Sequence, residues 1–339
     1  MPAPATATEF LQLLKKSELV ENDCLEEYLR QRSEPLPASA KEAAQDLVRA
    51  ELITSFQADQ LLQGKFRGFR VGKYTVLSPL GAGGMSSVYL AIDKATGQKV
   101  AIKVLPKAKA EDSVVLKRFR REGRAIAALE HPNIVRAFEM DQDEKLVFLV
   151  MEYVEGISLH EMVKERGPLP IPLACRFIRQ AAIGLQYVHD SGMVHRDIKP
   201  ANLLVDKEGN IKIFDMGLAR FLEDKDDILT RGVIGTADYI APEQTYDSHS
   251  VDIRADIYGL GGTFYYLLTG SVPFGEGKVS QKIQWHRSRM PDPIRSFRPE
   301  VPSALVMIVD KMMAKNPAER FQQPIEVAEA IDAFLQEMD

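Results

Sequence analysis

The feature that most constrains the fold of this chain is its longest apolar stretch, residues 257–268, which reads IYGLGGTFYYLL. Its length is about half to two thirds of the ~20 residues that a helix needs to cross a bilayer. Because the stretch is apolar on every side, it predicts a core helix surrounded by protein and not a surface helix with one wet face. The rest of the fold therefore has to pack around residues 257–268.

Composition is that of an ordinary globular protein. The 339 residues include 45% hydrophobic and 27% charged ones, which is enough for one large domain and a small one. The net charge of -5 gives no basic excess to attract nucleic acid. Cys24 and Cys175 are too few for a disulfide framework, and the first residues resemble neither an export nor a lipidation signal. We therefore expect a cytoplasmic protein with no membrane segment and no nucleic-acid partner.

Helix formers dominate the start of the chain. Apolar residues recur at helical spacing through residues 8–64 and predict three or four short helices. Residues 17–29 resemble residues 50–62 at an offset of 33 (50 minus 17), and a Pro-Leu-Pro loop beginning at Pro35 separates the copies. The sequence therefore predicts a helical N-terminal domain at residues 1–66, with a possible duplicated helix pair, for interaction or regulation.

The pattern changes at Lys73 to short β-rich runs flanked by turn residues. One helix is predicted to interrupt these strands around residues 112–129, and from about Ser158 onward the chain becomes mainly helical. A small β-rich lobe therefore precedes a larger helical lobe. Residues 64–72, rich in Gly and Arg, are predicted to link this unit to the N-terminal helices.

A glycine-rich segment, GAGGMSSV at residues 81–88, lies between two predicted strands. Glycines there let the backbone fold over phosphate groups with its amides exposed. The alternative is a hairpin with no ligand, and the segment is not a Walker A loop because no Gly-Lys-Ser/Thr follows. Its interpretation depends on the motifs that come after it.

Lys103 ends the motif VAIK in an otherwise apolar strand, where burial of an unpaired ammonium would be costly. It needs an anionic partner, and Glu122 lies 19 residues further on (122 minus 103) in the predicted helix. A Lys–Glu pair would direct the ammonium at nucleotide phosphates. The alternative for Glu122 is a solvated charge on the helix surface.

The segment HRDIKPAN, residues 195–202, brings a carboxylate, a cation and a carboxamide close together, and Asp215 follows 13 residues later (215 minus 202). Mg²⁺ prefers oxygen ligands and keeps several waters, so Asn202 and Asp215 suffice with the substrate's own phosphates. Asp197 is then available to accept the proton of an attacking hydroxyl. Lys199 would neutralise charge on the transferring phosphoryl group.

These motifs follow the order found in the eukaryotic-like (Hanks-type) protein kinase family, which the chain resembles over about residues 74–335. The series comprises Gly81, Gly83 and Val88, then Lys103, HRD at 195–197, DMG at 215–217 and APE at 241–243. The sequences of these motifs are most similar to those of bacterial Ser/Thr members. The resemblance implies a bilobal α+β fold, with a β-rich N-lobe containing one helix at 74–151 and a large helical C-lobe at 155–335, preceded by the small all-α domain.

The resemblance also implies a non-specific Ser/Thr protein kinase that transfers the γ-phosphate of ATP to protein hydroxyls with Mg²⁺ or Mn²⁺. Lys199 and Thr236 carry the Ser/Thr assignment. The implied catalytic residues are Asp197, Lys199, Lys103 and Glu122, and the implied metal ligands are Asn202 and Asp215. The implied ATP-binding residues are Leu80, Gly81, Ala82, Gly83, Gly84, Met85, Ser86, Ser87, Val88, Ala101, Lys103, Met151, Glu152, Val154 and Leu204.

The resemblance also covers residues that are expected to regulate the kinase and residues that support its catalytic loop. Arg196 offers charge-assisted hydrogen bonds to a phosphate on the activation segment, for which Thr230 is the candidate site. Autophosphorylation at Thr230 would order residues 221–234. Asp256 is expected to brace the catalytic loop.

By the same resemblance, Arg320 is expected to pair with Glu243. Met216 stands where the family usually has Phe, and both side chains are large and apolar. Three alternatives stay open: a pseudokinase scaffold, a small-molecule kinase of related fold, and a chain whose main function lies in the N-terminal domain as adaptor or regulator.

Overall fold

The computed structural model describes residues 2–32, 35–82, 86–105, 113–143, 146–216, 237–246 and 251–338. They divide into two compact units. The first comprises Met1–Leu116 and Phe138–Tyr153, and the second Lys117–Ala137 and Val154–Asp339. The N-terminal helices and the first sheet therefore belong to the same compact unit, and the predicted domain boundary near residue 66 stays a prediction.

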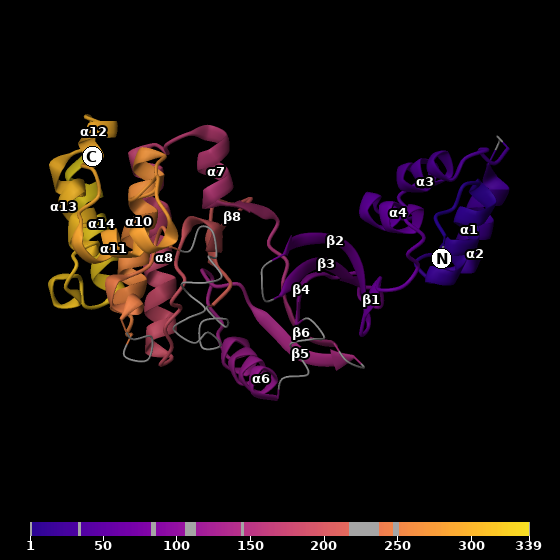
Figure 1. Ribbon diagram of the computed structural model, residues 1–339, viewed down its shortest axis with the longest axis horizontal. Helices are drawn as coiled ribbons and strands as arrows, with labels where there is room; N and C mark the ends of the chain where they lie inside the picture. Colours follow the sequence, from indigo (N-terminus) through magenta and orange to yellow (C-terminus); the bar gives the residue numbers. More distant parts are fainter. Residues whose placement is uncertain are drawn as a thin grey trace. The chain divides into compact units, whose positions relative to one another are not determined.

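The N-terminal helices form two pairs at the offset found in the sequence (Figure 1). They are α1 (Ala7–Ser17) and α2 (Asn22–Gln31), then α3 (Ala40–Arg49) and α4 (Ser55–Leu62). Thr6 and Ser39 begin the pairs with matching capping boxes. Glu18 and Glu51, which follow the first helix of each pair, share left-handed φ values of 56° and 57°. The repeat in sequence is thus matched by a repeat in backbone conformation.

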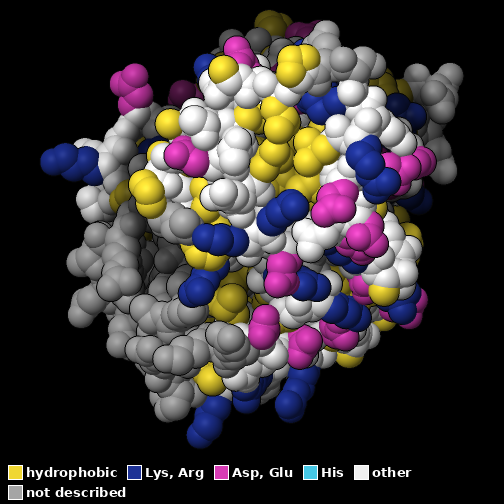
Figure 2. All heavy atoms as spheres, turned by 90° about the vertical axis from the view of Figure 1, so that its right-hand side faces the viewer, with side chains coloured by type: hydrophobic (Ala, Val, Ile, Leu, Met, Phe, Trp, Pro, Cys, Tyr) yellow, Lys and Arg dark blue, Asp and Glu magenta, His cyan; other side chains and the backbone are white. Residues whose placement is uncertain are grey.

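A common apolar core joins these helices, because each helix turns one apolar side toward the others. Its largest fully buried members are Phe10, Leu14, Leu25, Leu47 and Leu61. On the face that carries these helices in Figure 2, acidic and basic side chains are interspersed and a group of hydrophobic side chains gathers in the upper half.

The first unit continues into a six-stranded sheet of order β1-β2-β3-β4-β6-β5 among the described residues. Its strands are β1 (Arg70–Val71), β2 (Tyr74–Ala82), β3 (Ser87–Asp93), β4 (Lys99–Leu105), β5 (Ala137–Asp143) and β6 (Leu146–Glu152). The pairings β1–β2, β2–β3, β3–β4 and β4–β6 are antiparallel. Strands β2, β3, β4 and β6 occupy the β-rich runs that the sequence predicted, whereas β1 and β5 were not predicted.

The segment predicted as a linker, residues 64–72, is instead part of the packed structure. Phe69 is 3% exposed and belongs to the core of the N-terminal helices, while Arg70 and Val71 form β1. Gly72 has φ 57°, and a Cβ there would lie 3.0 Å from Phe148. The Gly and Arg content predicts a linker, but Phe66 and Phe69 of this segment pack against the core of the N-terminal helices.

The second unit is mainly helical (Figure 1). Its helices are α6 (Ser113–Ala127, which begins at the end of the first unit), α7 (Leu159–Arg166), α8 (Ile171–Asp190), α10 (Arg254–Thr269), α11 (Val279–Ser288), α12 (Ile294–Phe297), α13 (Ser303–Met312) and α14 (Pro324–Met338). Every residue of α10 from Ala255 to Thr269 is buried, which confirms the core helix predicted from the apolar stretch. It packs against α8, α12 and α13.

A small sheet, β7 (Gly156–Ser158), β8 (Leu203–Asp206) and β9 (Ile211–Ile213), completes this unit together with the 3-10 turns Pro200–Asn202, Pro242–Thr245 and Pro317–Glu319. Across the described ranges, none of the helices has both the length and the apolar content needed to span a lipid bilayer.

Candidate active site

One face of the first sheet collects the predicted nucleotide-binding residues. Val88 pairs with Lys103, and Lys103 pairs with Leu149. Ala101 pairs with Met151 in the same manner. Cross-strand partners point to the same side of a sheet, and residues two apart share that side. Val88, Ala101, Lys103 and Met151 therefore line one face.

The opposite face of this sheet is a separate apolar core. It contains Val76, Val100, Ile102, Phe148 and Val150. Lys103 is only 9% exposed although its neighbours Ile102 and Val104 are apolar. The strand thus presents a buried lysine side chain on the face opposite this core, and its anionic partner stays a prediction.

The glycine-rich segment is described at both ends. β2 ends with Gly81 and Ala82, which pair with Val88 and Ser87 of β3. Leu80 is 46% exposed at the end of β2. Gly83, Gly84, Met85 and the side chain of Ala82 lie outside the described residues.

The catalytic-loop residues lie together in the second unit. Lys199 Nζ contacts Asp197 Oδ2 at 2.8 Å, with both side chains largely buried. Asn202 Nδ2 donates to the carbonyl oxygen of Asp197 at 2.8 Å and to its Oδ2 at 3.1 Å. The carboxylate of Asp197 is therefore held by a cation and an amide in one orientation.

Asp256, in the first turn of α10, holds the backbone of the catalytic loop in place. Its two carboxylate oxygens accept hydrogen bonds from the backbone N–H groups of His195 (2.8 Å) and Arg196 (2.6 Å). Burial raises the pKa of Asp256 above its usual value, although these two backbone hydrogen bonds act to lower it. The bracing role expected of Asp256 is confirmed by this geometry.

His195 connects the loop to the segment that carries Asp215. Its Nδ1 accepts from the N–H of Asp197 at 3.2 Å, so the proton sits on Nε2, which lies 3.0 Å from the carbonyl oxygen of Phe214. The N–H of Phe214 donates to the carbonyl of Asn202 at 3.1 Å. Both backbone polar groups of Phe214 are therefore fixed to the catalytic loop.

The β8–β9 hairpin explains why residues 13 apart in sequence meet. Leu203 pairs with Ile213, so Asn202 and Phe214 lie at the same end of the hairpin. Asp215 follows with φ 57°, and Arg196 has φ 67°. A non-glycine residue adopts such angles only where its surroundings impose them, and such strain clusters at active sites.

The donor set suits Mg²⁺. Because Nδ2 of Asn202 faces Asp197, its Oδ1 is directed the other way, and Asp215 is exposed at the adjoining segment. One amide oxygen and one carboxylate are the hard oxygen ligands that Mg²⁺ accepts alongside phosphates and water. No group of three or more His, Cys, Asp or Glu side chains suited to a metal occurs among the residues that the structure describes.

Two residues at the loop were not predicted from the sequence. Gln244 Nε2 donates to the carbonyl of Arg196 at 2.9 Å, and its Oε1 accepts from the N–H of Ala241. At Gly259 in α10, a Cβ would lie 2.7 Å from the carbonyl oxygen of Ile198. The only sequence signals were a Gln after the APE motif and a Gly in a core helix.

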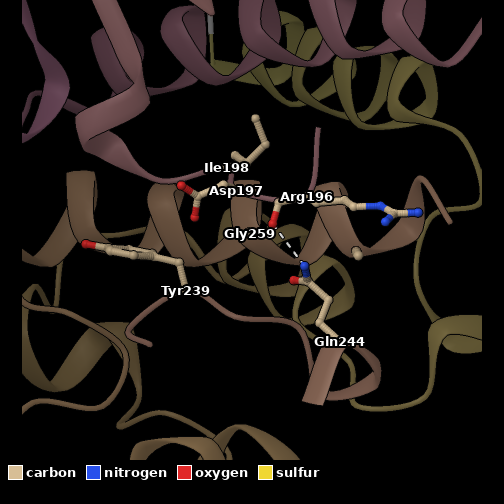
Figure 3. Close-up of a pocket in the computed structure, with 7 residues that line it drawn as sticks. Arg196, Asp197, Ile198, Tyr239, Gln244 and Gly259 are labelled. Carbon is tan, nitrogen blue, oxygen red and sulfur yellow. Dashed lines mark hydrogen bonds between the residues drawn. The ribbon is translucent and has the colours of Figure 1, made fainter. Parts of the chain in front are cut away.

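A small pocket lies where these elements meet (Figure 3). The labelled side chains of Asp197 and Arg196 extend in opposite directions from the loop, and the amide of Gln244 reaches the Arg196 backbone. The pocket is lined by Arg196, Asp197, Ile198, Tyr239, Gln244, Ala255 and Gly259.

The expected pair between Arg320 and Glu243 is also present. The guanidinium is fully buried and makes two hydrogen bonds to the carboxylate, at 2.6 and 2.8 Å. It also donates to the carbonyls of Ala314, Arg254 and Lys315.

The remaining predicted residues divide into two groups. Glu152, at the end of β6, and Val154 and Leu204 in the second unit are partly buried, as are Ser86 and Ser87. The side chain of Glu122 lies outside the described residues, although its backbone belongs to α6. Thr230 and Thr236, with residues 217–236 as a whole, also lie outside them.

Comparison with known proteins identifies the family. A protein kinase domain model matches residues 74–331. The chain is 38% identical over 265 residues to the serine/threonine-protein kinase PrkC of Bacillus subtilis, covering 78% of this chain and 40% of that protein. It is 41% identical over 264 residues to the serine/threonine-protein kinase PknB of Mycobacterium tuberculosis, covering 75% and 42%. The chain thus spans about two fifths of the length of these relatives.

A solved structure supports the same family and fold. The crystal structure of the Mycobacterium tuberculosis PknI kinase domain matches with a TM-score of 0.62 at 28% identity, covering 78% of this chain and 98% of that one. The α+β kinase fold, with a β-rich lobe and a helical lobe, is confirmed. This chain therefore belongs to the protein kinase family and is similar to its bacterial Ser/Thr members.

Proposed function

We propose that this chain is an active Ser/Thr protein kinase, which transfers the γ-phosphate of ATP to hydroxyl groups of proteins. The observation that carries the proposal is the catalytic loop, in which Lys199 and Asn202 hold the carboxylate of Asp197 while Asp256 holds the loop backbone. Lys103, Asp197 and Asp215, which non-catalytic scaffolds of this fold commonly lose, are all present in this chain. The names of the relatives PrkC and PknB support the same activity.

Asp197 is the proposed general base. Its carboxylate accepts the proton of the attacking serine or threonine hydroxyl as the oxygen–phosphorus bond forms and the bond to ADP breaks. Lys199, now 2.8 Å from Asp197, is the proposed donor to the transferring phosphoryl oxygens. Asn202 keeps Asp197 oriented through its amide nitrogen.

Asn202 and Asp215 are the proposed ligands of Mg²⁺, or Mn²⁺ in its place. When bound, the ion neutralises charge on the phosphates of ATP. The chain's own contribution is positional, because the β8–β9 hairpin and the hydrogen bond from Phe214 to Asn202 bring the two ligands together.

The nucleotide is proposed to bind through the face of the first sheet that carries Lys103, with Glu122 as the partner of that lysine. Val88 and Ala101 share this face and would contact the adenine ring. By the family resemblance, Leu204 is a further proposed contact of the ring. Met151 and the backbone of Glu152 and Val154 complete the proposed adenine contacts. The remaining proposed contacts are Leu80, Gly81, Ala82, Gly83, Gly84, Met85, Ser86 and Ser87.

Regulation by autophosphorylation at Thr230 is a further part of the proposal. Arg196 extends away from Asp197 (Figure 3), so a phosphate bound to its guanidinium would not compete with the substrate hydroxyl. Thr236 is the proposed marker of Ser/Thr acceptors. Because ATP and Mg²⁺ are supplied in the cytoplasm, we propose that the kinase acts there.

The test is incubation of the full chain with γ-labelled ATP and a mixture of Ser, Thr and Tyr peptides. We expect label on Ser and Thr, none on Tyr, and loss of transfer when a chelator removes Mg²⁺. Replacement of Asn202 by Ala should raise the Mg²⁺ concentration needed for half-maximal rate. Absence of label from the Ser and Thr peptides would refute the proposal.

A further inference from the structure

The N-terminal helices contact the strand that carries the glycine-rich segment. Gln57 Nε2 donates to the carbonyl oxygen of Val76 at 2.7 Å, and Thr54 Oγ1 donates to that of Leu77 at 2.6 Å. Gln57 is only 3% exposed. These contacts lie within the first compact unit.

These contacts complete an edge of the sheet. β1 pairs with β2 only as far as Thr75, so the rest of β2 has no neighbouring strand on that side among the described residues. At Val76 the missing strand is replaced, because the Val76 N–H donates to the carbonyl of Phe69 at 2.8 Å and its C=O accepts from Gln57. The Phe69 side chain belongs to the core of the N-terminal helices. The backbone of Phe69 and the side chain of Gln57 in α4 thus satisfy both polar groups of Val76.

The hydrogen bonds from Thr54 and Gln57 to β2, called the clamp below, lie at a β-bulge. The pairing of β2 with β3 shifts between Val76 and Ser78, which leaves Leu77 as the extra residue. Thr54 satisfies the carbonyl of this residue. A second shift lies between Pro79 and Gly81. Thr54 and Gln57 therefore hold β2 at its first register shift, four residues before Gly81 (81 minus 77), or about 13 Å along the strand.

Thr54 and Gln57 bond to β2 and also form the capping box of α4. The N–H of Thr54 donates to Gln57 Oε1, and the N–H of Gln57 donates to Thr54 Oγ1. The capping box therefore holds both side chains in the rotamers that reach β2. The first helix pair has Glu21 and Cys24 at the equivalent positions (54 minus 33, 57 minus 33), and both are exposed.

An apolar contact supports the clamp from the rear face. Phe56 packs against the sheet core that contains Val76 and Phe148, on the side opposite Lys103. Lys94, after β3, donates to the carbonyl of Leu19 at 3.0 Å. The helical region therefore supports the sheet without covering its nucleotide face.

We propose that Thr54 and Gln57 are positioning residues that set the register of β2 and thereby the affinity of the glycine-rich segment for ATP. The inference rests on the proposed kinase function. It assigns the N-terminal helices to the catalytic unit itself, as an intramolecular support, in place of a tethered adaptor.

The test uses two point variants in the full chain. Gln57→Glu keeps the shape and the acceptor for the Thr54 N–H but removes the donor to Val76, and Thr54→Val removes the hydroxyl. Each should raise KM for ATP about threefold to tenfold, the worth of one or two hydrogen bonds, with kcat and KM for the peptide little changed. Thr54→Ser should restore the wild-type KM.

Matched controls separate positioning from helix stability. Ser39→Ala and Glu42→Gln alter the capping box of α3, in which Ser39 and Glu42 bond to each other, and should leave KM for ATP unchanged. A variant that merely lowers the folded fraction would reduce kcat and leave KM unaltered, and that result would overturn the proposal. So would equal KM shifts in the α3 controls.

Hydrogen exchange gives a readout that does not depend on activity. Amides of residues 74–82 should exchange faster in Gln57→Glu than in wild type, and not in Glu42→Gln. If the wild type transfers no phosphate, the proposed function fails, while exchange at residues 74–82 still decides whether Thr54 and Gln57 hold the strand. Unchanged exchange in Gln57→Glu would overturn the clamp.

Discussion

Replacement of Arg320 by Met should strongly destabilise the helical unit. The guanidinium has no exposed surface, makes two hydrogen bonds to Glu243 and donates to three backbone carbonyls. It also lies 4.8 Å from the ring centre of Tyr258. Breaking a buried ion pair from one side costs about 3–5 kcal/mol because the partner charge and acceptors lose their compensation. For a unit of this size, that corresponds to a loss of about 10 °C in melting temperature.

A tryptophan in the helical unit provides a fluorescence probe for this measurement. Trp285 is the single tryptophan and lies in α11, 6.4 Å from the ring of Phe274 in the same unit. Its fluorescence during urea or thermal unfolding therefore reports on the helical unit. Arg254→Met is the matched control, because Arg254 forms a partly exposed pair with Asp252, worth about 0–1 kcal/mol. If Arg320→Met shifted the midpoint no further than Arg254→Met, the stabilising role of the buried pair would be refuted.

Three further outcomes are expected. Burial lowers the pKa of His286 to about 3 from 6.5. Between pH 6.5 and 3 the unfolded chain therefore binds more protons than the folded one, and stability should fall as the pH drops through this range. His286→Phe should flatten this part of the profile of urea midpoint against pH, and an unchanged slope would contradict the assignment. Gly259→Ala should cost about 1–3 kcal/mol and lower kcat, because the new methyl meets the Ile198 carbonyl, whereas Gly275→Ala, with open space, should do neither. Burial raises the pKa of the Cys175 thiol to about 12, so a thiol reagent at pH 8 should modify exposed Cys24 alone until urea unfolds the chain; two thiols reacting in the native state would exclude this.

The catalytic loop was predictable because its chemistry is local in sequence. Asp197, Lys199 and Asn202 lie within one short segment, and their types alone indicate a base, a cation and an amide. The resemblance added Asp256 and Arg320, whose partners lie 60 or more residues away. Without that resemblance, a buried Asp at the start of an apolar helix would have suggested only helix capping or a satisfied core charge.

The contacts that escaped prediction depend on tertiary packing. Gln244 reaches Arg196 across 48 residues, and Gln57 reaches Val76 across 19. No spacing rule links such pairs, because each depends on how one element packs on another. The Gly and Arg content of residues 64–72 predicts a linker, whereas the burial of Phe69 decides the structure of this segment.

The central claim is that Asp197 acts as the catalytic base of a protein kinase. The most direct measurement is the single-turnover rate of label transfer from Mg²⁺-ATP to a peptide hydroxyl, comparing wild type, Asp197→Asn and Asp190→Asn. Asp190 is an exposed aspartate at the end of α8 and serves as the matched control. We predict a loss of at least about 100-fold for Asp197→Asn and a wild-type rate for Asp190→Asn. Equal rates in wild type and Asp197→Asn would contradict the account.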